Sequence, residues 1–298
     1  MKIDWLKGCA TALVTPFHKD LSVDEDCFQK LVARQIDGGV KLLVPCGTTG
    51  ESVTMSESER LRVIELTVEV AKSKNAFVIA GVGTNNTAAT IEFTQKAEKL
   101  GVNAALVVAP FYNKPTQEGM YAHFKAIADS AKDLPMMLYN VPSRTASNIS
   151  AATTLRLASD CANIVSTKEA SGNLSQVMEI LQNRAEGFTV FSGDDATALP
   201  LISLGADGLV SVASNELPDL MSQMTNFALY DNFEKAREIH YKVLGLMEAN
   251  FIESSPAPLK FVMSQMNLLE ENLRLPLVPV TEGSRKILLE VLSKLDLV

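Results

Sequence analysis

The sequence predicts a (β/α)8 barrel followed by a C-terminal helical region. Eight short apolar runs recur through the first two-thirds of the 298 residues, segments with helical spacing separate them, and only helical segments follow the eighth run. The runs are apolar almost throughout rather than alternating, which is typical of parallel strands covered on both faces. Strict alternation of strands and helices predicts a parallel sheet, and eight strands close such a sheet into a barrel.

The expected strands are rich in Val, Ile, Leu and Ala. They cover residues 10–14, 42–46, 77–82, 104–109, 136–140, 164–168, 189–192 and 208–212. An open doubly wound sheet is the alternative, and it usually carries a glycine-rich phosphate turn after its first strand. Here the first strand continues into Thr15-Pro16-Phe17, which favours the barrel.

Capping signals mark the ends of the expected helices. Ser56 and Glu59 form the Ser-x-x-Glu pattern of a capping box at the start of a helix predicted over 56–73. Ser22 and Glu25 repeat this pattern before a second helical run. Glycine is the usual residue just beyond a helix end. The expected stop signals are Gly38, Gly39 and Gly101.

Three further helices are expected after the last strand. They cover residues 231–250, 257–269 and 282–297. Barrels of this kind often occupy about 250 residues as one unit. We therefore expect a barrel over 1–224 and a C-terminal helical region over 225–298.

Composition excludes several classes of protein. Hydrophobic residues make up 47% and charged residues 21%, the balance of a soluble globular protein. A net charge of −8 without a Lys/Arg cluster argues against nucleic acid as a partner. The sequence has no apolar run of about 18 residues and does not start like a signal peptide, so we expect no membrane association and a cytoplasmic location.

The cysteines and histidines do not indicate a metal or disulfide site. The four cysteines are widely scattered without a Cys-x-x-Cys pair, and the three histidines are far apart. Structural zinc and a disulfide framework are therefore not expected. Cys9 and Cys161 are expected to be small apolar core residues, because free cysteine is among the most buried residue types.

Lys168 ends the sixth expected strand. Most lysines are solvated surface charges. In a barrel, however, the active site lies at the carboxyl ends of the strands, so this side chain would point into the mouth of the barrel. Desolvation there favours a neutral amine with a free lone pair, which is what Schiff-base chemistry requires.

The sequence Gly-Thr-Thr-Gly-Glu, residues 47–51, directly follows the second expected strand. It is compatible with a simple tight turn. Its glycines also let backbone N–H groups converge, and the hydroxyls of Thr48 and Thr49 add donors. The turn is therefore suited to holding a carboxylate.

Three more polar side chains follow strands four and five. Tyr112 comes after strand four and Tyr139 lies at the end of strand five, although a tyrosine that is packed with its hydroxyl at the rim is equally common. Arg144 comes next along the chain. It fits either a solvated loop charge or a bidentate clamp for a second carboxylate.

With these residues the chain resembles the dihydrodipicolinate synthase family, within the wider group that includes N-acetylneuraminate lyase. The resemblance runs essentially from end to end. Its motifs are Gly-Thr-Thr-Gly-Glu at 47–51, Tyr-Asn-Val-Pro-Ser-Arg-Thr at 139–145, Thr-Lys-Glu-Ala-Ser-Gly-Asn at 167–173, Ser-Gly-Asp-Asp at 192–195 and Leu-Arg-Leu-Pro at 273–276. The set is highly specific, although no single motif is.

The resemblance implies a lysine-dependent condensation of pyruvate with aspartate semialdehyde. Lys168 would form an imine with pyruvate, and Thr48, Tyr112 and Tyr139 would form a hydroxyl relay for protons. In such enzymes the tyrosine at position 112 is supplied across a dimer interface. The resemblance therefore implies a homo-oligomer, typically a tetramer of two tight dimers.

The resemblance also assigns the binding residues. Thr49 and nearby backbone groups would hold the pyruvate carboxylate, and Arg144 would receive aspartate semialdehyde. Backbone carbonyls of Gly193 and Val210 would complete the pocket. No metal or organic cofactor is required, and the expected product is 4-hydroxy-tetrahydrodipicolinate, on the route to diaminopimelate and lysine.

Two other functions remain to be weighed. A sialic acid or sugar-acid lyase of the same group would keep Lys168 and Tyr139 but cleave a polyhydroxylated substrate. Arg144 favours the synthase, because it suits a short aldehyde that carries a carboxylate. A non-catalytic barrel that binds a keto acid is the second alternative, and nothing favours it because all the proposed catalytic side chains are present.

Feedback inhibition by lysine is expected to be weak or absent. Regulated members of the family bind lysine at a dimer interface, at positions that correspond to Ser52, Glu57, Arg60, Asn85, Ala89 and Phe111. Ser52 and Asn85 fit, whereas the family's glutamate is replaced by Ala89, its tyrosine by Phe111 and its two histidines by Glu57 and Arg60. Glu57 offers a substitute carboxylate, for which Arg60 would compete as an i, i+3 partner.

Overall fold

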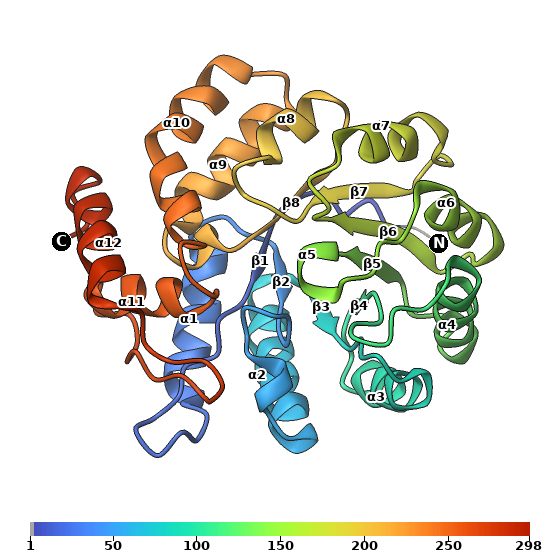
Figure 1. Cartoon of the computed structure of the whole chain (residues 1–298), viewed down its shortest axis with the longest axis horizontal. Coiled ribbons are helices and arrows are strands. Elements are labelled where there is room, and N and C mark those ends of the chain that lie inside the picture. The colour runs from blue at the N-terminus through green and yellow to red at the C-terminus, as the bar shows by residue number, and fades with distance from the viewer. Residues whose placement is uncertain (1–2) are drawn as a thin grey trace.

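The computed structural model describes residues 3–298 and contains a closed barrel of eight parallel strands (Figure 1). The strands follow one another around the barrel in sequence order, and β1 pairs with β8 to close it. They are β1 Gly8–Ala12, β2 Leu42–Val44, β3 Phe77–Gly81, β4 Ala104–Val108, β5 Met136–Asn140, β6 Ile164–Glu169, β7 Thr189–Ser192 and β8 Gly208–Ser211. The predicted (β/α)8 barrel is confirmed.

Helices surround the barrel, and the helices that end the chain lie together on one side of it (Figure 1). The helices up to the last strand are α1 Glu25–Asp37, α2 Glu57–Lys74, α3 Thr87–Lys99, α4 Gln117–Ser130, α5 Pro142–Thr145, α6 Ala151–Asp160, α7 Leu174–Asn183 and α8 Ala198–Ser203. Those beyond it are α9 Pro218–Leu229, α10 Phe233–Ala249, α11 Ala257–Gln265 and α12 Glu282–Lys294. No helix within residues 3–298 is long and apolar enough to cross a membrane.

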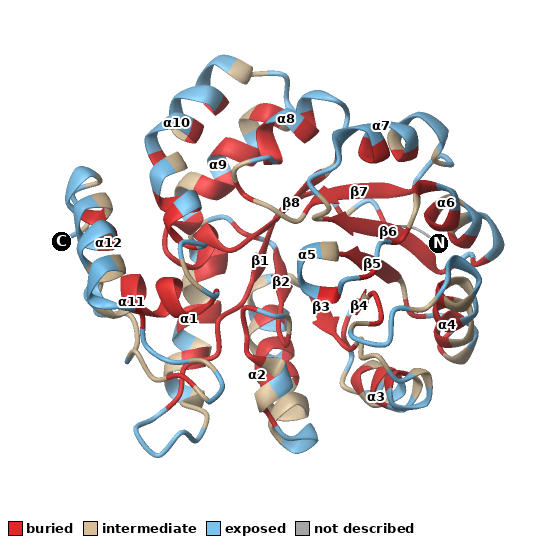
Figure 2. Cartoon of the chain, viewed as in Figure 1, coloured by how far each residue is buried: buried red, intermediate tan, exposed pale blue. Residues whose placement is uncertain are grey.

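The core has an inner and an outer layer (Figure 2). Inside the barrel, alternate strand residues form one cluster that includes Val44, Leu106, Tyr139 and Phe191. A larger cluster fills the space between the barrel and α1–α8. Both faces of each strand are therefore buried, which explains why the strands read as continuous apolar runs.

Helix α9 connects the barrel to the C-terminal helices. It packs against β1 and β8, and α10 packs against α9. Apolar residues of β8, α9, α10 and α11 share one buried cluster. The expected boundary at residues 224/225 falls within α9, so we propose to place it between α9 and α10.

Helix ends follow the capping signals in part. The Ser56–Glu59 capping box is confirmed, with both reciprocal hydrogen bonds present. The predicted Ser22–Glu25 box is wrong, because Asp24 caps α1 by accepting a hydrogen bond from the N–H of Cys27. Ser22 instead donates to Asp20.

The bounds of several strands and helices also differ from the prediction. Strand β1 begins and ends two residues earlier than expected, because Gly8 and Cys9 pair with β8. Helix α9 was missed. The three helices expected beyond it are present but shorter, at Phe233–Ala249, Ala257–Gln265 and Glu282–Lys294. Cys9 and Cys161 are buried, as predicted.

Candidate active site

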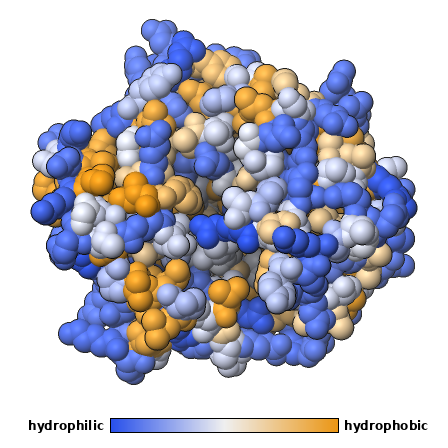
Figure 3. Space-filling view, viewed as in Figure 1, coloured by the Kyte–Doolittle hydropathy of each residue, from blue (hydrophilic) through white to orange (hydrophobic). Residues whose placement is uncertain are grey.

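A cavity of about 670 Å³ opens at the carboxyl ends of the strands. Its wall includes Lys168, Tyr139, Arg144 and the turn Gly47–Thr49. The loop before α11 also contributes to it, through residues 251–255. The face seen in Figure 3 is mainly hydrophilic, with hydrophobic side chains in separate clusters.

A register shift between β5 and β6 determines where Lys168 lies. Met136 pairs with Ile164, but Met137 pairs with Ser166, so Val165 is skipped. With an unshifted register Tyr139 would pair with Thr167, whereas the shift pairs it with Lys168. Such a bulge re-aims the side chains that follow it. Lys168 is thereby placed in register with two barrel-interior residues, Tyr139 and Phe191.

The Lys168 side chain is buried and stands free of carboxylates. It is 5% exposed, and its Nζ lies 4.2 Å from the centroid of the Tyr139 ring. Among the described residues it forms no ion pair within 4.0 Å. Gly193 leaves room for it, since a Cβ at position 193 would lie 3.0 Å from the Lys168 Cε and 2.7 Å from the Cβ of Ala170.

The next residue along β6, Glu169, supports this strand end from outside the barrel. Its buried carboxylate accepts hydrogen bonds from the Asn140 side chain (3.1 Å), the Ser171 N–H (2.8 Å) and the Gln176 side chain (3.0 Å). Asn140 follows Tyr139 and pairs with Glu169 in the sheet. Neutral donors therefore satisfy this carboxylate and tie the ends of β5 and β6 together.

The Gly-Thr-Thr-Gly-Glu segment forms a closed turn. The N–H of Glu51 donates to the carbonyl of Thr48 (3.0 Å), and the hydroxyl of Thr15 donates to the carbonyl of Gly50 (2.9 Å). Thr49 is buried, and Thr48 is exposed at the cavity. The segment is thus a tight turn, and Gly47, Thr48 and Thr49 line the cavity.

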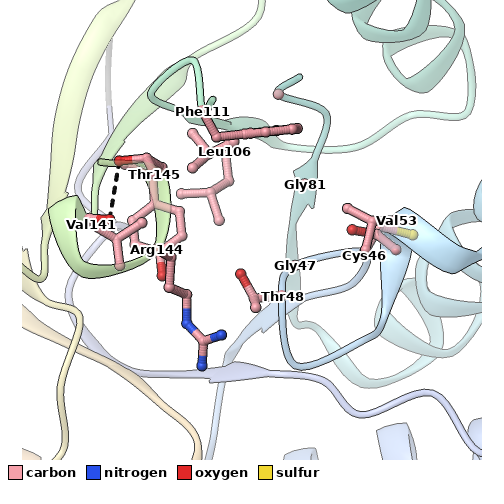
Figure 4. Close-up of a pocket in the computed structure, with 14 residues that line it drawn as sticks. Cys46, Gly47, Thr48, Val53, Gly81, Leu106, Phe111, Val141, Arg144 and Thr145 are labelled. Carbon is pink, nitrogen blue, oxygen red and sulfur yellow. Dashed lines mark hydrogen bonds between the residues drawn. The ribbon is translucent and has the colours of Figure 1, made fainter. Parts of the chain in front are cut away.

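A smaller cavity of about 220 Å³ adjoins the first (Figure 4). Thr48, Tyr139 and Arg144 line both cavities, and Phe111 and Val53 line the smaller one. Figure 4 shows the Arg144 side chain extending from α5 toward Thr48. Its guanidinium forms no ion pair within 4.0 Å with the described residues, so it is available to an anionic ligand.

Two of the predicted site residues lie away from the cavity walls of this single chain. Tyr112 is 88% exposed, with a left-handed backbone (φ 73°), and it lines neither cavity. Val210 is fully buried in β8, within the inner cluster of the barrel. The barrel thus brings together Lys168, Tyr139, Thr48, Thr49, Arg144 and Gly193.

Sequence reasoning missed the cavity residues of the loop before α11. Glu253 and Ser254 belong to this loop, which is more than 80 residues from Lys168 along the chain. They lack a strand-end position or a motif, and only the packing of α10 and α11 beside the barrel brings them there. Asp194 also lines the cavity, and its Ser-Gly-Asp-Asp motif was a usable signal.

Buried carboxyl groups brace the wall behind β8. Asp195 accepts hydrogen bonds from the hydroxyl of Ser211 and the N–H groups of Val212 and Ala213. Burial raises the pKa of Asp195, and its hydrogen bonds oppose this shift. Burial also raises the pKa of Glu216 well above its usual value, although its hydrogen bond from Asn250 opposes the shift.

Comparisons with known proteins agree with this geometry. The model of the dihydrodipicolinate synthetase family matches residues 5–295. The chain is 46% identical over 298 residues to a 4-hydroxy-tetrahydrodipicolinate synthase of Chlorobium phaeobacteroides, with all of both chains covered. It is 51% identical over 281 residues to one of Koribacter versatilis, covering 94% of this chain and 93% of that one.

Solved structures give the same result. A dihydrodipicolinate synthase from Aquifex aeolicus superposes with a TM-score of 0.95 at 41% identity, covering 98% of this chain and 99% of that one. One from Cyanidioschyzon merolae with lysine bound superposes with a TM-score of 0.96 at 40% identity, covering 99% of each chain. The chain belongs to the dihydrodipicolinate synthetase family.

Proposed function

We propose that this chain is a lyase that condenses pyruvate with L-aspartate 4-semialdehyde to give 4-hydroxy-tetrahydrodipicolinate. The observation that carries the proposal is a buried lysine, Lys168, that shares a cavity with the guanidinium of Arg144, neither of which forms an ion pair within residues 3–298. The full-length relatives are named for this reaction and not for sugar-acid cleavage. The reaction belongs to the biosynthesis of diaminopimelate and lysine.

The chemistry begins at the amine of Lys168. Its nitrogen attacks the ketone carbon of pyruvate, a C–N bond forms and water leaves, giving an iminium. The iminium accepts the electron pair released when the pyruvate methyl group loses a proton, and the resulting enamine attacks the aldehyde carbon. The amine of the second substrate then adds to the imine carbon, expels Lys168 and closes the ring.

Protons must enter and leave at each of these steps. Thr48 and Tyr139 line the cavity with Lys168, and we assign their hydroxyls to a proton relay. Tyr112 would complete the relay from a second subunit. Tyr112 follows Phe111, which lines the smaller cavity, but its own ring is exposed and lies outside that cavity. This position supports a contribution to the site of a partner subunit.

The two substrate carboxylates need separate donors. We assign the pyruvate carboxylate to Thr49 and the backbone of its turn, and the carboxylate of aspartate semialdehyde to Arg144. Backbone carbonyls at Gly193 and Val210 would complete the pocket. The backbone of Gly193 lies close to Lys168, since a Cβ there would be 3.0 Å from the Lys168 Cε and 2.7 Å from the Cβ of Ala170, and this closeness supports the assignment.

We further propose a homotetramer built from two tight dimers. Val53, which lines the smaller cavity, and Tyr112, which follows the cavity residue Phe111, are both highly exposed, as expected of a dimer contact that completes the site. A second exposed apolar set, Leu174, Met178 and Leu204, lies on α7 and at the end of α8. Two separate apolar surfaces are what a dimer of dimers requires.

Replacing Lys168 tests the nucleophile. Lys168→Ala and Lys168→Arg are expected to lower turnover by at least about 10³-fold, because neither supplies a neutral amine. Borohydride reduction with pyruvate should give a stable mass gain on Lys168 of the wild-type enzyme and none in either variant. If no pyruvate adduct were trapped on the wild-type protein, the proposed enzymatic function would be contradicted and a non-catalytic barrel that binds a keto acid would be favoured.

Replacing Arg144 tests the second carboxylate site. Arg144→Ala is expected to raise the KM for aspartate semialdehyde and to lower kcat/KM by about 1.5–3 kcal/mol, the contribution of a charge-assisted hydrogen bond. Borohydride trapping of pyruvate serves as the control and should be unchanged. If only the pyruvate kinetics changed, the assignment would be wrong.

Mixed oligomers test whether Tyr112 acts across an interface. Lys168→Ala and Tyr112→Phe protomers, each weakly active alone, should regain about a quarter of wild-type activity when co-refolded, because half of the dimers are mixed and one of their two sites is intact. The matched control mixes Lys168→Ala with Tyr139→Phe, whose residues share one chain, and should regain none. Equal results for both mixtures would refute the role across the interface.

The surroundings of Glu57 and Arg60 bear on inhibition by lysine. The expected competition between them does not occur, because Glu57 pairs with Lys96 (2.6 Å) and the Arg60 guanidinium lies 4.0 Å from the centroid of the Phe93 ring. Glu57 therefore already binds an ammonium group, that of Lys96, which Glu92 shares (2.6 Å). An ammonium ligand without a carboxylate partner binds poorly.

We expect L-lysine at millimolar concentration to change initial rates little at sub-saturating pyruvate. The Ala89→Glu variant, which restores the missing carboxylate on the exposed first turn of α3, should be more sensitive to lysine than the wild type. Strong cooperative inhibition of the wild-type enzyme would show that the site has been rebuilt from other residues.

A further inference from the structure

We propose that Lys260 of the C-terminal helical region is a positioning residue, which holds the turn of Thr48 and Thr49 through a buried ion pair with Glu51. The inference rests on the proposed function, because it takes this turn to be the pyruvate-binding element. It also gives a role to two parts of the sequence that the mechanism leaves unused: Glu51 and the Leu-Arg-Leu-Pro motif at 273–276.

The ion pair is fully removed from solvent. The side chains of Lys260 on α11 and Glu51 are both 0% exposed, and the Lys260 Nζ lies 2.5 Å from the Glu51 Oε1. Lys260 also donates to the carbonyl of Asn272 (2.8 Å) and lies 4.1 Å from the centroid of the Phe17 ring. Burial lowers the pKa of Lys260 to about 8, although Glu51 opposes this shift.

Glu51 closes the turn that carries the two threonines. Its backbone has a left-handed conformation (φ 51°), which is unfavourable for a residue other than glycine. Its N–H donates to the carbonyl of Thr48 (3.0 Å), and its carbonyl accepts from the N–H and the hydroxyl of Thr54 (3.0 and 2.9 Å). Anchoring the Glu51 side chain therefore fixes the carbonyl of Thr48.

The Leu-Arg-Leu-Pro motif holds the second oxygen of the same carboxylate. The N–H of Arg274 donates to the second oxygen of Glu51 (3.1 Å). The Arg274 guanidinium donates to Glu59 on α2 (2.5 Å) and to the carbonyl of Thr54 (3.0 Å). The Arg274 hydrogen bond lowers the pKa of Glu59 to about 2, so this contact is ionic at neutral pH.

The energetics favour a geometric role over a stabilising one. Desolvating two charges cancels most of their attraction, so a buried pair often contributes no more stability than apolar residues of the same volume. Removing one partner is different, because it leaves a buried, unpaired charge. The loss of Lys260 would therefore displace Glu51, and with it the carbonyl of Thr48.

The variants Lys260→Met, Glu51→Gln and the double variant form a double-mutant cycle. The readout is borohydride trapping of pyruvate over a range of concentrations. Lys260→Met should raise the pyruvate concentration for half-maximal trapping by about tenfold, which corresponds to 1.4 kcal/mol. Trapping at saturation should remain complete, because Lys168 lies on β6 and not on the turn.

The double variant separates positioning from folding. With Glu51→Gln no carboxylate remains opposite Lys260, so adding Lys260→Met should change the half-maximal concentration much less than it does in the wild-type background. Equal effects in the two backgrounds would show that Lys260 does not act through Glu51. The double variant contains no buried charge at this pair, so it remains measurable if Lys260→Met alone fails to fold. It is then compared with Glu51→Gln, and a further clear rise in the half-maximal concentration would show that Lys260 does not act through Glu51.

Arg184→Met is the matched control for a general loss of stability. Arg184 pairs with Asp207 and donates to the carbonyl of Gly205, at the start of β8 and away from the cavity. The Arg184→Met substitution should lower the Tm without changing the pyruvate concentration for half-maximal trapping. If pyruvate is trapped on the wild-type enzyme and folded Lys260→Met shows the same pyruvate dependence, the positioning role is refuted while the proposed function stands. If wild-type enzyme is not trapped, the proposed function fails instead.

Discussion

The skipped residue in the pairing of β5 with β6 is the constraint on which the site depends. Every side chain that follows Val165 along β6 changes its position relative to β5 because of this shift. Lys168 then lies in register with Tyr139, and its neighbour Glu169 lies in register with Asn140. One irregularity in the ladder thus places an amine inside the barrel and a carboxylate outside it.

The fold was largely predictable because its signals are local. Parallel strands covered on both faces must be apolar throughout, and eight such runs were visible in the sequence. The errors arose where a neighbouring residue or a distant strand competes with a local signal. Asp24 replaces Ser22 as the cap of α1 because α1 begins at Glu25, and β1 begins at Gly8 because β8 offers it partners there.

The site was predictable to the extent that its residues end strands. Lys168, Tyr139 and the turn of Thr48 and Thr49 do so, and the structure brings them to one cavity. The bulge at Val165 has no signature in the sequence, since valine is ordinary in any strand. The loop over 251–255 reaches the cavity only through the packing of α10 and α11, which no local pattern encodes.

Two carboxylates next to the site along the chain, those of Glu169 and Glu51, are satisfied by groups other than Lys168 and Arg144. Glu169, adjacent to Lys168 in sequence, faces away and is satisfied by neutral donors. Glu51, adjacent to the threonine turn, is paired with Lys260 from the C-terminal region. An amine that must attack a ketone cannot be held by a carboxylate, which would favour its charged form. The surrounding networks therefore make the turn and β6 rigid, and within residues 3–298 they leave Lys168 and Arg144 without an ion pair.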